Sequence, residues 1–316
     1  MKKYIIAILI VIGGLGVYAF FNSANVSDSD GDKISVVSSF YPLYFFASEI
    51  GGEHVNVRNI TPAGVEPHDY EPTPQDVIAI EKSDVLVLNG AGFEPWSENV
   101  LSTIPTEKVV IAGEAFATLE GTEDEHEERK EAPHEDENEE HLTDPHVWLS
   151  PALARRMAER IRDGIIAADP ENESDYRANA DDLIAKLTAL DSEFKNGLQL
   201  CARRDMITSH AAFAYIARDY NLRQVAISGL SPEEEPSAQE LAEIVEFARQ
   251  NNVKYIFFET LVPAAFSETV ASEIGAQTLV LNPLEGLTSE EQTAGKNYFT
   301  EMRQNLTNLK IALQCR

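Results

Sequence analysis

Two kinds of apolar pattern alternate along most of the chain. Short apolar runs of strand length occur at residues 34–40, 84–89 and 108–111, and again at 206–208, 223–227, 254–258 and 277–281. The stretches at 73–81, 237–251 and 264–274 instead have apolar residues at helical spacing. Strands that alternate with helices are typical of βαβ units, so each half is predicted to be a mostly parallel sheet flanked by helices.

A long helical region separates the two halves. Residues 151–168 are predicted to form one helix, which ends at Asp169 because the residue before a proline disfavours helical backbone. Residues 171–200 form the next, since their apolar positions recur at helical spacing. About 30 residues at 1.5 Å each span roughly 45 Å. The expected fold class is therefore α/β, with two lobes joined by one long linking helix; an ordinary core helix is the alternative.

These boundaries predict the domain organisation. Residues 1–33 are a signal or anchor segment with a linker, 34–170 the N-terminal lobe, 171–200 the linking helix and 201–316 the C-terminal lobe. A chain of 316 residues is long enough for two lobes of ordinary size.

The N-terminus has the pattern of an export signal. Lys2 and Lys3 precede an uncharged, mostly apolar stretch from Tyr4 to Phe21, which is close to the roughly 20 residues that span a bilayer. The residues that follow form a poor cleavage site. An uncleaved membrane anchor is therefore favoured over a cleaved signal, with the basic end in the cytoplasm and the rest of the chain outside.

The chain has two cysteines, Cys201 and Cys315. Neither follows the apolar N-terminal run, so lipid attachment to an N-terminal cysteine is excluded. In an oxidising compartment a disulfide between them is expected, with two free thiols as the alternative.

Charge narrows the function. The net charge of −28 argues against nucleic-acid binding, because phosphate contacts need clustered basic residues. Residues 123–141 contain eleven acidic residues together with three histidines and almost no apolar side chains. This composition predicts a mobile loop over about 119–143. The loop is either a solvated charge run or a weak metal collector, since histidine and carboxylate both suit zinc.

Three other histidines lie in loops between strands and helices: His68, His146 and His210. Ligands of open α/β sheets bind at strand ends. A single histidine in such a loop is more often a cap or a surface residue, but three in the same setting favour a set of ligands.

Four stretches make the chain recognisable: residues 68–72 (HDYEP), 144–148 (DPHVW), 209–213 (SHAAF) and 229–237 (GLSPEEEPS). With them the sequence resembles the solute-binding proteins of zinc and manganese ABC importers, the cluster A-I family, over nearly all of residues 34–316. The resemblance implies an extracytoplasmic receptor, not an enzyme, that binds a metal ion between its lobes. It also implies delivery to a membrane permease driven by an ATPase. A monomer is expected.

The same resemblance implies particular ligands. His68 and His146 match ligands of the N-terminal lobe, and His210 matches a third position at which manganese-type members carry glutamate. The family's frequent fourth ligand, an aspartate, aligns with Asn282, which is a poor ligand. The fourth position is then left to water, to Glu66 or to the acidic loop. Three imidazoles favour zinc over manganese.

Other functions stay open at this point. A manganese receptor or an adhesin would share the fold. A zinc-dependent hydrolase would use the same histidines with Glu66 or Glu259 as base, although neither a nucleophile elbow nor a His-Glu-x-x-His motif is present.

Overall fold

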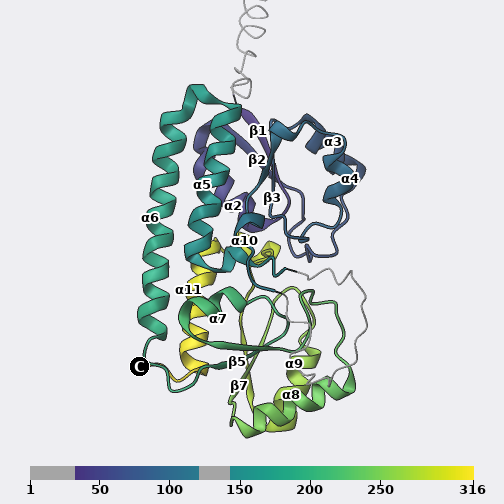
Figure 1. The fold of residues 1–316 in the computed structure, drawn as a ribbon, viewed down its shortest axis with the longest axis vertical. Coiled ribbons are helices and arrows are strands. Elements are labelled where there is room, and N and C mark those ends of the chain that lie inside the picture. The colour runs from purple at the N-terminus through teal and green to yellow at the C-terminus, as the bar shows by residue number, and fades with distance from the viewer. Residues whose placement is uncertain (1–32, 121–142) are drawn as a thin grey trace, which may run out of the picture. The chain divides into compact units, whose positions relative to one another are not determined.

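Two four-stranded parallel sheets organise the described part of the chain, residues 33–120 and 143–316 of a computed structural model (Figure 1). The first has the order β2-β1-β3-β4, from β1 (Ile34–Ser38), β2 (Val55–Asn59), β3 (Val85–Leu88) and β4 (Val109–Ile111). The second has the order β6-β5-β7-β8, from β5 (Asp205–Thr208), β6 (Arg223–Ala226), β7 (Tyr255–Phe258) and β8 (Gln277–Val280). The predicted α/β fold class is confirmed. The predicted anchor and most of the acidic loop lie outside the described residues.

Helices cover both sheets. The first half contains α2 (Tyr41–Gly51), α3 (Pro74–Lys82) and α4 (Ser97–Leu101), and the middle of the chain contains α5 (Pro151–Ala168) and α6 (Glu173–Leu198). The second half contains α7 (Ala214–Tyr220), α8 (Ala238–Gln250), α9 (Ala265–Ile274), α10 (Ser289–Thr293) and α11 (Tyr298–Ala312). Within the described residues, no helix is both long enough and apolar enough to cross a membrane.

The strands pack both of their faces, as expected of parallel sheets. In the first sheet Val85 and Val87 join a core with α2 and α5, whereas Leu86 and Leu88 point to the opposite face and pack with residues of α3 and α4. The second sheet divides in the same way between its own outer helices and the central core. The central core is continuous from one sheet to the other, because it includes buried residues of α5, α6, α7 and α11.

The long helix α6 is 26 residues long and lies along both halves (Figure 1). One face is buried, with Tyr176, Leu183 and Leu187 toward its start and Leu190 and Phe194 toward its end. It contacts α2 and α5 on the first half and α7 and α11 on the second. The helix therefore connects both sheets through one rigid element, as was predicted for the long linking helix.

A disulfide fastens the end of this helix to the end of the chain. Cys201 and Cys315 are bonded, which confirms the predicted pair. Both residues also form an antiparallel bridge, and the backbone N–H of Arg316 donates to the carbonyl of Leu200. The bond thus joins the segment after α6 to the segment after α11, shortly before the amino end of β5.

Candidate metal centre

Four side chains converge where the carboxyl ends of the two sheets meet: His68, His146, His210 and Glu285. His68 follows β2 and His146 follows β4, whereas His210 follows β5 and Glu285 follows β8. Parallel strands place all their carboxyl ends on one edge, which explains why segments so distant in sequence meet there. The structure brings the three predicted histidines together and adds a carboxylate.

The donor atoms are arranged for a small tetrahedral cation. Nε2 of His146 lies 3.3 Å from Nε2 of His68 and from Nε2 of His210. Oε1 of Glu285 lies 3.2 Å from Nε2 of His68 and 3.3 Å from Nε2 of the other two histidines. All four donor atoms lie within 4.8 Å of one another. A regular tetrahedron with edges of about 3.3 Å has its centre about 2.0 Å from each corner, which is the zinc–imidazole distance, so the five short separations suit a zinc ion.

Two further carboxylates orient the imidazoles. Nδ1 of His146 lies 2.8 Å from Oδ1 of Asp144, and Nδ1 of His210 lies 2.7 Å from Oε1 of Glu259. When each Nδ1 carries the hydrogen, each Nε2 presents its lone pair to the centre. This pairing fixes both the tautomer and the ring direction that metal binding needs.

The segment that carries His146 is held from both halves of the chain. Asn89, after β3, donates from Nδ2 to the carbonyl of Pro145 at 2.9 Å. From the other side, the indole of Trp148 donates to the carbonyl of Pro283 at 2.8 Å, and the hydroxyl of Tyr298 donates to the carbonyl of Trp148 at 2.6 Å. These bonds leave His146 little freedom.

An aromatic wall shields the site from water. The centroid of the Phe93 ring lies 4.6 Å from that of the His68 ring and 5.0 Å from that of the Trp148 ring. The preceding turn is fixed by the buried carboxylate of Glu94, which accepts from the hydroxyl of Ser39 and from two backbone N–H groups of residues 89 and 90. His146, His210 and Glu285 are fully buried, and the His68 side chain is 10% exposed. His68 is therefore the most exposed of the four candidate ligands.

Charge is balanced within the metal-free site. Burial would lower the pKa of His210, but Glu259 and Glu285 outweigh burial and raise that pKa well above its ordinary value. The pKa of His146 is also raised, because Asp144 and Glu285 outweigh burial, whereas burial lowers the pKa of His68. Burial opposes ionisation of Glu285, but the histidines lower its pKa well below the usual range. At neutral pH the site thus pairs a carboxylate with imidazolium.

Metal binding at this site is therefore expected to release protons. Zinc needs the lone pair of His210, so the proton held there in the metal-free protein must leave at pH 7. Each released proton makes the affinity fall about tenfold per pH unit as the pH drops, and the dependence levels off above the raised pKa of His210. Zinc calorimetry in two buffers of different ionisation enthalpy should give at least about one proton per ion.

Glu259→Gln is the matched variant for this measurement. Glutamine keeps an oxygen that accepts from Nδ1 of His210, but it removes the charge that most strongly raises the pKa of that imidazole. The number of protons released at pH 7 should fall. Zinc binding with no proton release in the wild-type protein would contradict the charge balance described above.

The structure offers a fourth donor that was not among the expected alternatives. Asn282 does not leave the site without a protein carboxylate, because Glu285 lies three residues later and reaches all three Nε2 atoms. Asn282 instead shapes the loop, since its Oδ1 accepts from the backbone N–H of Leu284. The available signal was a glutamate in a loop directly after a predicted strand.

The two glutamates named as alternatives have other partners. Glu66 accepts from the backbone N–H of His68 at 3.2 Å, and burial together with Glu285 raises its pKa to about 9. Glu259, the other candidate base, hydrogen-bonds His210. The predicted acidic-loop contribution concerns residues outside the described ranges.

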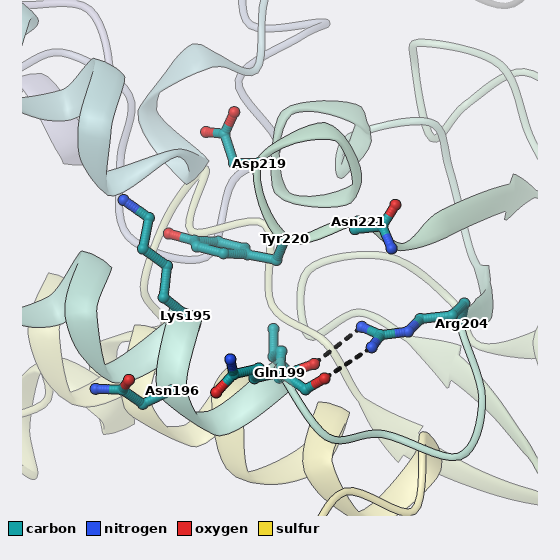
Figure 2. A pocket seen from close by; sticks show the side chains of 8 residues that line it. Lys195, Asn196, Gln199, Arg204, Asp219, Tyr220 and Asn221 are labelled. Carbon is teal, nitrogen blue, oxygen red and sulfur yellow. Dashed lines mark hydrogen bonds between the residues drawn. The ribbon is translucent and has the colours of Figure 1, made fainter.

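A surface pocket of about 360 Å³ lies at the end of α6, and none of the four donor residues lines it. Figure 2 shows the side chains that do. The two basic residues of the pocket already have partners: Arg204 donates to the carbonyls of Leu198 and Gln199, and Lys195 donates to Asp191. Its acidic residue, Asp219, accepts from the hydroxyl of Ser150 and from Nε of Arg218, so each charged side chain of this pocket has a partner.

The fold and the centre together define a class: a two-lobed, metal-binding solute receptor. Residues 36–312 match the ZnuA family, described as the periplasmic component A of a zinc-uptake complex. The chain belongs to this family.

Individual relatives of the chain are named for zinc uptake or zinc binding. The high-affinity zinc uptake system protein ZnuA of Bacillus subtilis (strain 168) is 41% identical over 91% of this chain and 90% of its own. The zinc-binding lipoprotein AdcA of Streptococcus pneumoniae is 42% identical over 91% of this chain, which spans 57% of that longer protein.

Solved structures of metal-binding proteins have a similar fold. The Zn(II)-bound ZnuA-like domain of Streptococcus pneumoniae AdcA superposes with a TM-score of 0.73 at 38% identity, over 89% of this chain and 99% of that one. The laminin-binding protein Lmb of Streptococcus agalactiae, described as an adhesin with metal-transporting activity, gives 0.75 at 32% identity, over 89% and 100%.

Proposed function

We propose that this chain is the extracytoplasmic receptor of a zinc importer, which captures Zn²⁺ between its two lobes and delivers it to a membrane permease driven by an ATPase. The observation that carries the proposal is the cluster of three Nε2 atoms and one carboxylate oxygen: Oε1 of Glu285 lies 3.2–3.3 Å from each Nε2, and Nε2 of His146 lies 3.3 Å from the other two. His68, His146, His210 and Glu285 are the proposed ligands. Neighbouring family members named for zinc binding and zinc uptake support it.

The proposal includes the arrangement of the chain. Residues 34–170 and 201–316 act as the two lobes, and 171–200 as the helix that links them. The periplasmic description of the family supports a position outside the cytoplasm. Attachment through residues 4–21 and a monomeric receptor are further parts of the proposal, which N-terminal sequencing and light scattering of the mature protein would test.

Metal preference is the direct test. Imidazole suits zinc, whereas manganese favours oxygen donors, and divalent affinities rise from manganese toward zinc in general. Metal-free protein should therefore bind zinc at least about 100-fold more tightly than manganese, because one carboxylate does not make the site oxygen-rich. Competitive titration with both ions measures the ratio.

His210→Glu supplies the comparison within the same fold. It replaces one imidazole by a second carboxylate, so the ratio should move toward manganese. Equal or tighter manganese binding by the wild-type protein would overturn the zinc assignment and leave a metal receptor of the other type.

A further inference from the structure

Tyr215 occupies an unusual position between the two halves of the molecule. Its side chain is fully buried in the first turn of α7, five residues after His210. Its hydroxyl donates to the carbonyl of Asp144 at 2.8 Å and lies 3.1 Å from the N–H of Thr118 and 3.4 Å from that of Leu119. One hydroxyl of the second half thus meets three backbone groups of the first.

The three backbone groups belong to two segments that run side by side. The N–H of Asp144 donates to the carbonyl of Leu119 at 2.9 Å, and Glu120 and Thr143 form an antiparallel bridge. Tyr215 therefore fixes both segments at once, directly before the chain reaches His146.

A short chain of bonds leads from this hydroxyl to the metal centre. Asp144, whose carbonyl accepts from Tyr215, uses Oδ1 to accept from both the backbone N–H and Nδ1 of His146, each at 2.8 Å. On the other side of Tyr215, the backbone leads through Phe213 and Ala211 back to His210. The phenol is thus bonded to the segment of one ligand and covalently continuous with the segment of another.

We propose that Tyr215 is a positioning residue that sets the separation of His146 from His210, and so determines how long the site retains its metal ion. The inference rests on the proposed function. Phenylalanine would fill the same space, but it would leave one carbonyl and two N–H groups without their partner, and the segment of Asp144 would relax. The ligands themselves would be unchanged.

A second hydrogen bond would keep α7 in place when the hydroxyl of Tyr215 is removed. Near the other end of α7, Oδ2 of Asp219 accepts from the hydroxyl of Ser150 at 2.5 Å. This contact also joins α7 to the segment after His146, and it does not involve Tyr215. Loss of the phenol should therefore loosen the position of Asp144 without detaching α7 from its neighbours.

Tyr215→Phe is compared with Tyr220→Phe, which lies on the same helix. Tyr220 is also buried, but its hydroxyl donates to Asp191 of α6 at 3.1 Å and touches no ligand segment. Tyr215→Phe should raise the Kd for zinc about 10-fold, through faster dissociation. Effects of this size are typical when a residue that orients a metal ligand is replaced. Tyr220→Phe should leave the Kd within about twofold.

Cobalt serves as a spectroscopic probe, because its visible absorption reports donor geometry. The Co²⁺ spectrum should change in Tyr215→Phe and match the wild type in Tyr220→Phe, a difference that a general loss of stability would not produce. Equal effects of the two variants on Kd and spectrum, or no effect of either, would overturn the proposal.

Hydrogen exchange of the wild-type protein tests the same contact without any variant. The amides of Thr118 and Leu119 should be protected with and without zinc, and rapid exchange of both would overturn the proposed role. Failure of wild-type protein to bind zinc would instead refute the proposed function, so the two outcomes are separable.

Discussion

Glu285→Gln is expected to weaken zinc binding by at least about 100-fold, the upper end of the effects seen when only a supporting residue is changed. Oε1 of Glu285 lies 3.2–3.3 Å from three Nε2 atoms, and Oε2 is buried without a hydrogen-bond partner among the described residues. Both facts are explained if the carboxylate coordinates a cation, which balances its negative charge. The neutral amide is a poorer ligand and leaves the buried dication with no ligand charge to balance it.

Glu66→Gln is the matched control. Glu66 is also a largely buried acidic side chain beside the site, but its pKa is raised to about 9, it accepts a hydrogen bond from the backbone of His68, and it is absent from the group of converging donors. Its replacement should change the zinc Kd by less than about tenfold. Calorimetric titration of both variants decides which glutamate binds the ion; the reverse order of effects would move the fourth ligand to Glu66.

Loss of the disulfide should lower the stability of the protein substantially. Cys201 and Cys315 are separated by 114 residues, and cross-linking so long a loop restricts the unfolded chain by about 4 to 5 kcal/mol in the loop-entropy model. Native-state effects usually reduce this figure, so replacing both cysteines by serine should cost about 2 to 4 kcal/mol of unfolding free energy. Urea unfolding of the metal-free protein measures it.

The zinc affinity of this double variant should change little. The bond lies before the amino end of β5, whereas His210 follows the carboxyl end of the same strand. Reductant should destabilise the wild-type protein and leave the double variant unaffected. A large loss of zinc affinity together with unchanged stability would show that the bond acts on the site instead of the unfolded chain.

Local patterns predicted seven of the eight described strands and the helices α3, α5, α6, α8 and α9, but not α2, α4, α7, α10 and α11. The apolar runs at β1, β3, β4 and β5 to β8 stand out because parallel strands are buried on both faces. β2 was missed because it alternates Val55 and Val57 with Asn56 and Arg58, which is the pattern of a half-exposed edge strand. The predicted disulfide followed from counting cysteines in an exported chain.

The sequence by itself determined the fold class, the long helix and the three histidines, because strand ends are local features and parallel sheets gather them on one edge. Tertiary structure alone decided the fourth donor and the supporting bonds. Glu285 meets His68 across 217 residues, and its direction depends on a turn in which Leu284 has a φ of 56° and Asn282 caps the loop. Neither a turn geometry nor a contact over that separation leaves a periodic trace in the chain, so only the folded protein assembles the complete site.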